Sequence, residues 1–134
     1  MYLLDTNILS ELVKKQRSEA FLYKLSTVSS ASLHTAGICV MELKYGALRA
    51  SYGGQLWERI QGEVLSRVNI VGFGYKEALQ AAEILNMLHT HGQPIGLEDV
   101  LIAAVAMSNG LIVVTANTKH FYRIPDLRVE NWLS

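Results

Sequence analysis

Three acidic residues interrupt or introduce apolar segments of this chain. Asp5 follows a short apolar start, Glu42 lies inside an apolar run, and Asp99 opens an alanine-rich apolar stretch. A carboxylate in such surroundings needs a cation or hydrogen-bond donors, or else it stays protonated. Each also has an ordinary explanation: Asp5 as a helix cap, Glu42 as a side chain reaching solvent or a distant arginine, and Asp99 as a complement to a helix dipole.

Glu42 is the most informative of the three positions. One helical turn further along the chain stands Gly46, so no local ion pair can neutralise the carboxylate. Lys44 would project from a different side of the same helix. A partner for Glu42 must therefore come from elsewhere in the fold.

The three carboxylates together predict a metal site. In a parallel α/β sheet the strand-to-helix junctions meet at one edge, so acids placed there would converge. Each close pair would repel by about 4 kcal/mol at an effective dielectric of about 20, and a bound cation would remove that cost. Oxygen ligands without a cysteine cluster or paired histidines favour Mg²⁺ or Mn²⁺. The expected chemistry is metal-assisted attack of water on a phosphodiester.

Further polar residues follow the apolar run 111–114. Thr115 and Asn117 would add a hydroxyl and an amide at the same sheet edge, although turn chemistry alone would explain them. Histidines at positions 34, 89, 91 and 120 lack a zinc-binding spacing and are expected to be surface or hydrogen-bonded groups. Cys39, among apolar neighbours, is expected to pack in the core.

The elements that must position these residues alternate between short apolar strands and longer helical patterns. The expected strands cover 2–4, 33–35, 68–72 and 111–114, with a last one near Val129. One expected helix begins at position 8, and the others cover 38–48, 56–65, 78–88 and 98–108. The helix 38–48 is apolar on nearly every side and should be buried. Alternating elements of this kind predict an α/β fold with a parallel sheet between helical layers.

Composition bounds the class of protein. A chain of 134 residues predicts one domain, 1–134, and a content of 50% hydrophobic and 18% charged residues excludes disorder. Twelve basic and twelve acidic residues cancel, so any contact with nucleic acid must be local. With one cysteine, no basic apolar leader and no run near the roughly 18 residues of a membrane span, a cytoplasmic protein without membrane contact is expected.

Several other classes of enzyme fail on particular residues. A haloacid-dehalogenase-type phosphotransferase would need a second aspartate where Asn7 stands. A receiver domain would need paired acids before its first helix, and no glycine-rich phosphate loop is present.

Four segments in order along the chain resemble the PIN-domain ribonucleases, and within them the VapC and FitB group of bacterial type II toxin–antitoxin pairs. The segments are Tyr2-Leu3-Leu4-Asp5-Thr6-Asn7-Ile8-Leu9-Ser10-Glu11-Leu12, Met41-Glu42-Leu43-Lys44-Tyr45-Gly46, Gly92-Gln93-Pro94-Ile95-Gly96 followed by Asp99 and Leu101-Ile102-Ala103-Ala104, and the tail from Thr115 to Leu133. Each motif alone is weak, whereas four in order at this spacing are specific.

The resemblance implies a three-layer α/β/α PIN domain with strand order 3-2-1-4-5. It implies that Asp5, Glu42 and Asp99 are the catalytic acids and that they bind Mg²⁺, with Mn²⁺ as the other candidate ion. Asp5 and Asp99 would be direct ligands, and Glu42 would either bind the ion through water or orient the attacking water. Thr6 and Thr115 would orient these carboxylates, and Asn117 would hold a metal-bound water.

Candidate phosphate contacts are the basic residues near these segments, although a solvated helix face would also explain each one singly. They are Lys14, Lys15, Arg17, Lys44, Arg49 and Lys119. Position 117 holds Asn where some members carry a fourth acid, and position 120 holds His where an acid is frequent. Both positions lack an acid that a complete second metal site would use, so the presence of that second site is left undecided. Glu98 is given no ligand role.

The resemblance also implies partners: a VapB-like antitoxin that blocks the site with a basic side chain, an RNA substrate with tRNA as one candidate, and a second copy in a homodimer. DNA would be contacted only through the antitoxin. The expected function is therefore that of a metal-dependent endoribonuclease toxin. The alternative is a catalytically quiet PIN module that pairs with a DNA-binding partner for repression.

Overall fold

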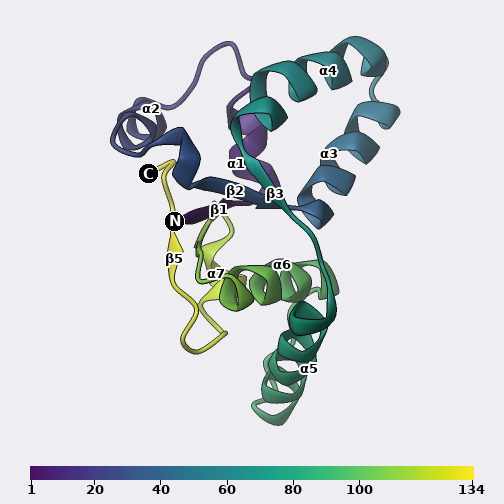
Figure 1. Cartoon of the computed structure of the whole chain (residues 1–134), viewed down its shortest axis with the longest axis vertical. Coiled ribbons are helices and arrows are strands. Elements are labelled where there is room, and N and C mark those ends of the chain that lie inside the picture. The colour runs from purple at the N-terminus through teal and green to yellow at the C-terminus, as the bar shows by residue number, and fades with distance from the viewer.

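A five-stranded parallel sheet runs through the centre of the computed structural model, which describes residues 1–134 (Figure 1). The strands are β1 (Tyr2–Leu4), β2 (Leu33–Ala36), β3 (Asn69–Val71), β4 (Ile112–Val114) and β5 (Val129–Glu130). They lie in the order β3-β2-β1-β4-β5, and every neighbouring pair is parallel. The expected α/β fold and strand order 3-2-1-4-5 are therefore confirmed, and the order reverses between β1 and β4.

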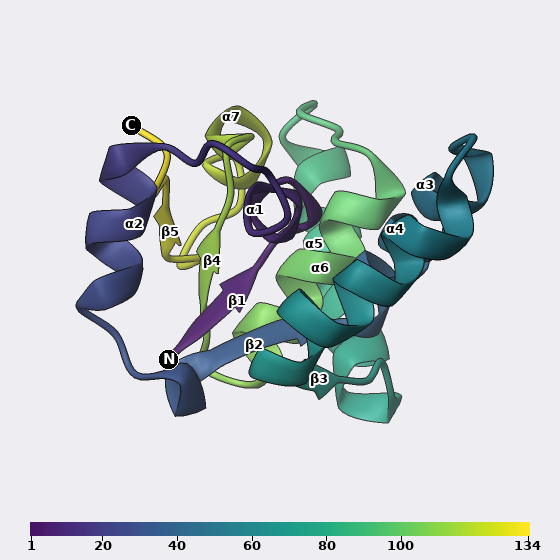
Figure 2. The ribbon, with the colours of Figure 1, turned by 90° about the horizontal axis from the view of Figure 1, so that it is seen from above.

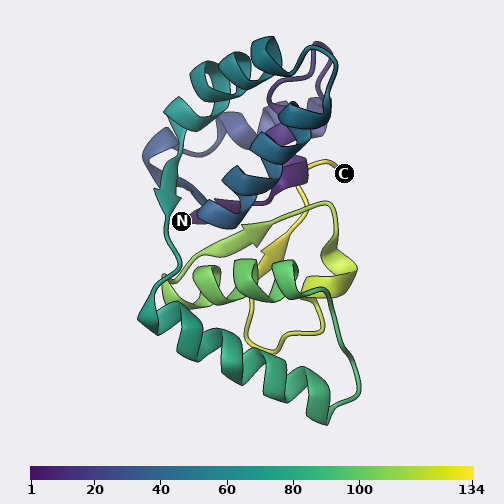
Figure 3. The same ribbon diagram turned by 90° about the vertical axis from the view of Figure 1, so that its right-hand side faces the viewer.

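Helices cover both faces of this sheet. Figure 3 shows α5 (Tyr75–Thr90) and α6 (Leu97–Ser108) on one face and α1 (Thr6–Glu11), α3 (Gly37–Arg49) and α4 (Gly53–Arg59) on the other. Seen from above in Figure 2, α2 (Glu19–Ser26) lies beside β5 at one end of the sheet, and the α3–α4 pair lies at the opposite end. The short helix α7 (Thr118–Phe121) follows β4.

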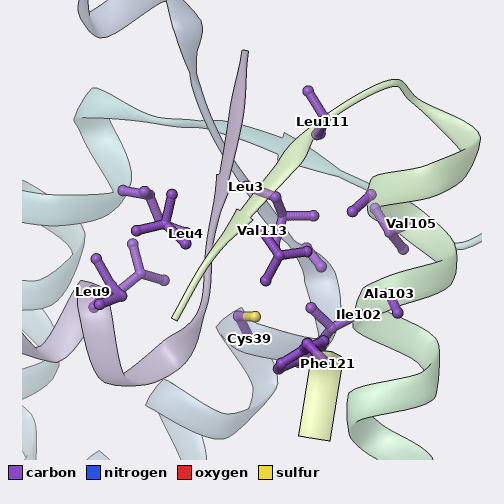
Figure 4. Packing of buried hydrophobic residues seen from close by; sticks show 14 of the residues in the cluster. Leu3, Leu4, Leu9, Cys39, Ile102, Ala103, Val105, Leu111, Val113 and Phe121 are labelled. Carbon is purple, nitrogen blue, oxygen red and sulfur yellow. The ribbon is translucent and has the colours of Figure 1, made fainter. Parts of the chain in front are cut away.

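The core forms where β1 and β4 meet the helices. Successive side chains of a strand point to opposite faces, so Leu3 lies with Val113 toward α6, and Leu4 lies toward Leu9 of α1 (Figure 4). All four side chains are fully buried. One cluster of 27 buried residues includes them, so the ends of β1 and β4 are fixed by packing on both faces.

Helix α6 contributes more buried residues than any other helix and closes with a glycine cap. Its buried positions include every residue from Ile102 to Ala106. Gly110 adopts a φ of 65°, in the left-handed region that glycine tolerates, and the Leu111 amide donates to the Ala106 carbonyl at 2.9 Å. The cap expected at Asn109-Gly110 is thus present, and it returns the chain into β4.

Helix α3 departs from the sequence-based expectation. It was expected to be buried on nearly every side, but only Cys39, Leu43 and Ala47 are buried. These residues are four apart and form one stripe, whereas Met41 and Tyr45 on other sides are 53% and 65% exposed. The prediction was wrong because α3 lies in an outer layer of the fold. One side of α3 packs against the rest of the protein, and its other sides face solvent.

Two helices were not predicted at all, and one was shortened. Helices α2 and α7 lack a long apolar period, and α7 has only four residues. The helix expected over 56–65 divides into α4, a π-helical turn Ile60–Val64 and a short 3₁₀ turn Leu65–Arg67. A further 3₁₀ turn, Ser30–Ser32, precedes β2. No helix of the chain has the length and hydrophobicity that crossing a bilayer would require.

Candidate metal centre

Asp5 stands at the carboxyl end of β1, where it caps α1. Its Oδ1 accepts a 2.8 Å hydrogen bond from the Thr6 amide, which is one of the free donors at the start of a helix. Its Oδ2 accepts a 2.8 Å hydrogen bond from the Thr115 hydroxyl at the end of β4. The two neighbouring strands at the reversal point therefore hold one carboxylate between them, and only 5% of Asp5 is exposed.

Burial dominates the ionisation of Asp5. Removal from water raises the pKa of this carboxyl, the hydrogen bonds from Thr115 and Thr6 lower it, and the charge of Asp99 raises it further. No lysine or arginine forms an ion pair with Asp5. A buried carboxylate without a cationic side chain is destabilised in its charged form.

Glu42 projects from α3 toward the same point. Its Oε1 accepts a 2.8 Å hydrogen bond from the Thr6 hydroxyl. Ligand atoms of Asp5, Glu42 and Cys39 lie within 4.8 Å of one another. Burial raises the pKa of Glu42, the Thr6 hydroxyl lowers it, and the neighbouring Glu98 raises it. Thr6 thus contacts both Asp5 and Glu42, through its amide and its hydroxyl.

Cys39 lies in this group but is not suited to hold a hard cation. Its side chain is fully buried, and burial followed by the charge of Asp5 raises the pKa of the thiol to about 12. Only the thiolate is a metal ligand. Cys39 therefore stays protonated and packs behind Asp5, with Sγ 3.9 Å from Oδ1.

Asp99 lies in the first turn of α6. Helix α6 packs beside the short helix α7 (Figure 3). Its Oδ2 is 2.8 Å from Nδ1 of His120, and the same Nδ1 is 2.9 Å from the side-chain amide of Asn117. Asp99 lies outside the group of ligand atoms within 4.8 Å of one another, yet its charge acts on Asp5. The third acid is therefore nearby and bound to His120.

The donor set fits a divalent cation with oxygen ligands. Asp5 and Glu42 offer carboxylate oxygens, both have raised pKa values, and neither has a cationic partner. A hard cation such as Mg²⁺ or Mn²⁺ prefers such oxygens and would stabilise the charged carboxylates. No thiolate or paired imidazole competes for a softer ion.

A protein-family model for the PIN domain matches residues 2–127. The chain belongs to the PIN-domain family. It is 35% identical over 132 residues to Ribonuclease VapC2 of Haemophilus influenzae, covering 98% of each chain. It is 32% identical to the tRNA(fMet)-specific endonuclease VapC of Shigella flexneri, covering 98% of this chain and 97% of the relative.

Solved structures resemble this PIN domain over its whole length. The crystal structure of FitAcB from Neisseria gonorrhoeae matches with a TM-score of 0.90 and 31% identity, covering 98% of each chain. The structure of VapBC2 from Rickettsia felis bound to a DNA fragment from their promoter matches with a TM-score of 0.88 and 31% identity over 98% of each chain. The proposed resemblance to the VapC and FitB group is confirmed.

Two polar residues of the PIN domain make contacts at the site that were not predicted from the sequence. Asn7 donates to Oδ2 of Asp5 and to the Thr115 hydroxyl, both at 3.4 Å, and accepts from the Ala116 amide at 3.0 Å. It fastens the exit of β4 to α1. Its position two residues after Asp5 was the available signal. His120, expected to be a surface or hydrogen-bonded group, is hydrogen-bonded, and its partner, Asp99, was not predicted.

The proposed basic contacts of the PIN domain have different surroundings. Lys44 places its ammonium 4.6 Å from the centre of the Trp57 ring, and Lys14 forms a 3.0 Å ion pair with Glu11. Lys119 is exposed on α7, immediately before His120. The remaining candidates are exposed, namely Lys15, Arg17 and Arg49. Among the six, Lys119 is the one adjacent in sequence to a residue that contacts a carboxylate of the site.

Proposed function

We propose that this chain is a metal-dependent endoribonuclease that acts as the toxin of a VapBC-type toxin–antitoxin pair, with residues 1–134 as one catalytic domain. One observation carries the proposal: two carboxylates with raised pKa values, Asp5 and Glu42, meet at the sheet's reversal point without a cationic partner. The names of the curated relatives, which are ribonucleases and a tRNA endonuclease, support RNA as the substrate.

The proposed roles of the acids follow from their contacts. Asp5 and Asp99 would hold the ion, and Glu42 would orient the attacking water. The ion would supply charge for the phosphate oxygens and lower the pKa of water. Oε1 of Glu42 accepts a hydrogen bond from Thr6, so Oε2 would be the oxygen that accepts the proton of the attacking water. Thr6 and Thr115 orient the carboxylates through their hydrogen bonds.

Mg²⁺ is the ion we propose, with Mn²⁺ as a substitute. Both take oxygen ligands and retain waters, which a hydrolytic site requires. Asn117 is proposed to hold a bound water near its backbone contact with Thr115, where its own amide donates to that hydroxyl at 3.0 Å. This leaves the carboxylates as the charged groups that bind the ion.

The substrate is proposed to be RNA, and tRNA is the candidate class because one relative is named a tRNA(fMet)-specific endonuclease. The chain has no net charge. Phosphate binding would therefore rest on local contacts, for which Lys119 is the foremost candidate, together with neutralisation of the acids by the ion. The cytoplasm is the proposed compartment, since RNA is found there.

The proposed partner is a VapB-like antitoxin that occupies the acidic site with a basic side chain. Structures of VapBC and FitAB complexes among the relatives support it, and one such complex holds promoter DNA. DNA would be reached through the antitoxin. The exposed residues Met41, Tyr45 and Leu48 form an apolar stripe on α3 that a partner would cover. A homodimer is also proposed, and sedimentation of the isolated protein tests it.

The alternative function is that of a catalytically quiet PIN module that only supports repression by a DNA-binding partner. Induced expression in a host without the antitoxin distinguishes this module from a nuclease. A nuclease arrests growth, Asp99→Asn relieves the arrest, and fresh RNA ends appear only with the unaltered protein. Asp126→Asn is the matched control, because Asp126 is exposed in a turn whose left-handed φ asparagine also adopts. Growth unaffected by the unaltered, folded protein would favour the module.

A further inference from the structure

We propose that His120 is a positioning residue that holds Asp99 in the orientation required for binding the divalent ion. The inference rests on the proposed function, because it assigns a role toward the same metal site. It concerns a residue that the resemblance placed near the site only as a replacement for an acid, with no role of its own.

Each acid of the site has one or more donors that fix it. Asp5 receives hydrogen bonds from the Thr6 amide, the Thr115 hydroxyl and the Asn7 amide. Glu42 receives one from the Thr6 hydroxyl. Asp99 has one partner, His120, whose Nδ1 lies 2.8 Å from Oδ2. The orientation of Asp99 therefore depends on this single side chain.

The proton on Nδ1 follows from the chemistry of the contact. An ionised carboxylate only accepts hydrogen bonds, so a nitrogen 2.8 Å from Oδ2 must be the donor. Nδ1 then cannot also accept from Asn117, so the Asn117 side chain must turn its oxygen toward the ring, where it shares the Nδ1 proton with Oδ2 of Asp99. Both the neutral Nδ1–H tautomer and the charged imidazole donate in this way, so the role does not depend on the charge of His120.

The contact fixes which oxygen of Asp99 remains available. Oδ2 is taken by His120, and Oδ1 accepts no hydrogen bond from the protein, so Oδ1 is the free ligand atom. The side chains of His120 and Asp99 are 42% and 21% exposed. An ion pair this close to water would add little to stability, and orientation of a ligand is the effect that such a contact can supply.

The segment after β4 thereby links two acids of the site. Thr115 contacts Asp5, the Asn117 amide donates back to Thr115 at 3.0 Å, and Asn117 also touches His120, which holds Asp99. Movement of this segment would displace Asp5 and Asp99 together. The positioning of Asp99 is thus coupled to the strand that already positions Asp5.

Metal affinity of the full chain, free of any antitoxin, tests the inference. Mn²⁺ dissociation constants are measured by the loss of its free electron-paramagnetic-resonance signal for the unaltered protein, His120→Ala, His120→Asn and His120→Gln. The Asn side chain places its Nδ2 where Nδ1 of histidine lies, whereas the Gln amide lies where Nε2 would be. His91→Ala is the matched control, since His91 is exposed and bonds only the Met87 carbonyl.

We expect His120→Ala and His120→Gln to raise the dissociation constant about 10-fold to 100-fold, His120→Asn to restore it to within about threefold, and His91→Ala to leave it unchanged. If His120→Ala does not fold by circular dichroism, the Asn and Gln variants carry the same comparison. Equal affinities for all the variants, or equal losses for Asn and Gln, would overturn the role of His120. Asp99→Asn separates the two proposals: if it leaves Mn²⁺ binding intact, the proposed metal site itself fails.

Discussion

The hydroxyl of Thr6 donates a 2.8 Å hydrogen bond to Oε1 of Glu42, which lies 36 positions further along the chain. The amide of the same Thr6 donates to Asp5 at 2.8 Å. One residue at the start of α1 therefore orients two carboxylates that come from different elements. The amide contact belongs to the helix cap and does not depend on the Thr6 side chain, whereas the contact with Glu42 depends on the hydroxyl.

Replacing the hydroxyl of Thr6 is expected to impair catalysis more than folding. Thr6→Val keeps the shape and the amide but leaves Glu42 without its donor, so kcat should fall about 10-fold to 100-fold. Thr6→Ser keeps the hydroxyl and should retain most of the activity. Thermal unfolding of the metal-free variants should change by a few degrees at most. Equal activity of the Val and Ser variants would show that the contact with Glu42 does not matter.

Without a metal ion, the stability of the protein is expected to fall as pH rises above about 4, the ordinary carboxyl pKa, through the raised pKa values of Asp5 and Glu42. A carboxyl whose pKa is raised on folding binds its proton more tightly in the folded state. Its contribution is therefore complete below its ordinary pKa and is lost as pH rises through the folded value. Asp5→Asn should stabilise the metal-free protein at pH 7 by about 1 kcal/mol, measured by urea unfolding.

Divalent metal should make the unaltered protein more stable than Asp5→Asn, which reverses their order in the metal-free state. At about 100 times its dissociation constant, a ligand of the folded state adds about 2.7 kcal/mol to stability. Asp5→Asn should lose most of that gain.

Glu11 is a control for the pH dependence and has the opposite sign. The Ser18 amide and then Lys14 lower the pKa of Glu11, so its contribution to stability is lost as pH falls. A metal-free protein whose stability peaks at pH 7, with no gain from Asp5→Asn, would contradict the burial of an uncompensated charge.

Lys119 is expected to contact the phosphate backbone of the RNA. Lys119→Ala should lower kcat/KM about threefold to tenfold and reduce the slope of log binding constant against log salt by about 1. Lys76→Ala is the matched control, because Lys76 is exposed and hydrogen-bonded to Asn109 at the opposite end of α6 from Asp99. Identical salt slopes for the two variants would remove Lys119 from the interface.

Cys39 is expected to be inert in the folded protein. Its thiol is fully buried and its pKa is raised to about 12, so almost no thiolate forms at pH 8. A disulfide reagent that releases a coloured thiol should react with Cys39 of the folded protein only at the rate of unfolding. The same reagent should react immediately with the protein unfolded in urea. Rapid reaction of the folded protein would show that the pocket behind Asp5 is open to solvent.

The candidate acids could be predicted from the sequence because their surroundings are local. Asp5 follows a strand and Asp99 begins an apolar helix. In a parallel sheet, the carboxyl ends of the strands and the amino ends of the helices that follow them lie at the same edge. The strand order needed the family resemblance, since nothing local places β4 rather than β3 beside β1. The π-helical turn after α4 likewise has no signal in the apolar pattern.

Contacts between distant segments were the part that the sequence could not supply. His120 reaches Asp99 across 21 positions because α7 folds back against α6, and this return depends on where β4 ends in the sheet. The exposed stripe of Met41, Tyr45 and Leu48 was misjudged for a related reason. Hydrophobicity alone does not tell how far a helix extends beyond the sheet that it covers.

Cleavage of RNA by the purified protein tests the central claim most directly. Total tRNA is incubated with the antitoxin-free protein in Mg²⁺, in Mg²⁺ with excess EDTA, and with Asp5→Asn, Glu42→Gln and Asp99→Asn, with the exposed Glu83→Gln as control. We expect discrete products from the unaltered protein and from Glu83→Gln in Mg²⁺, none in EDTA, and losses of at least about 100-fold for the three acid variants. Cleavage that persists in EDTA and in Asp5→Asn would contradict a metal-dependent ribonuclease.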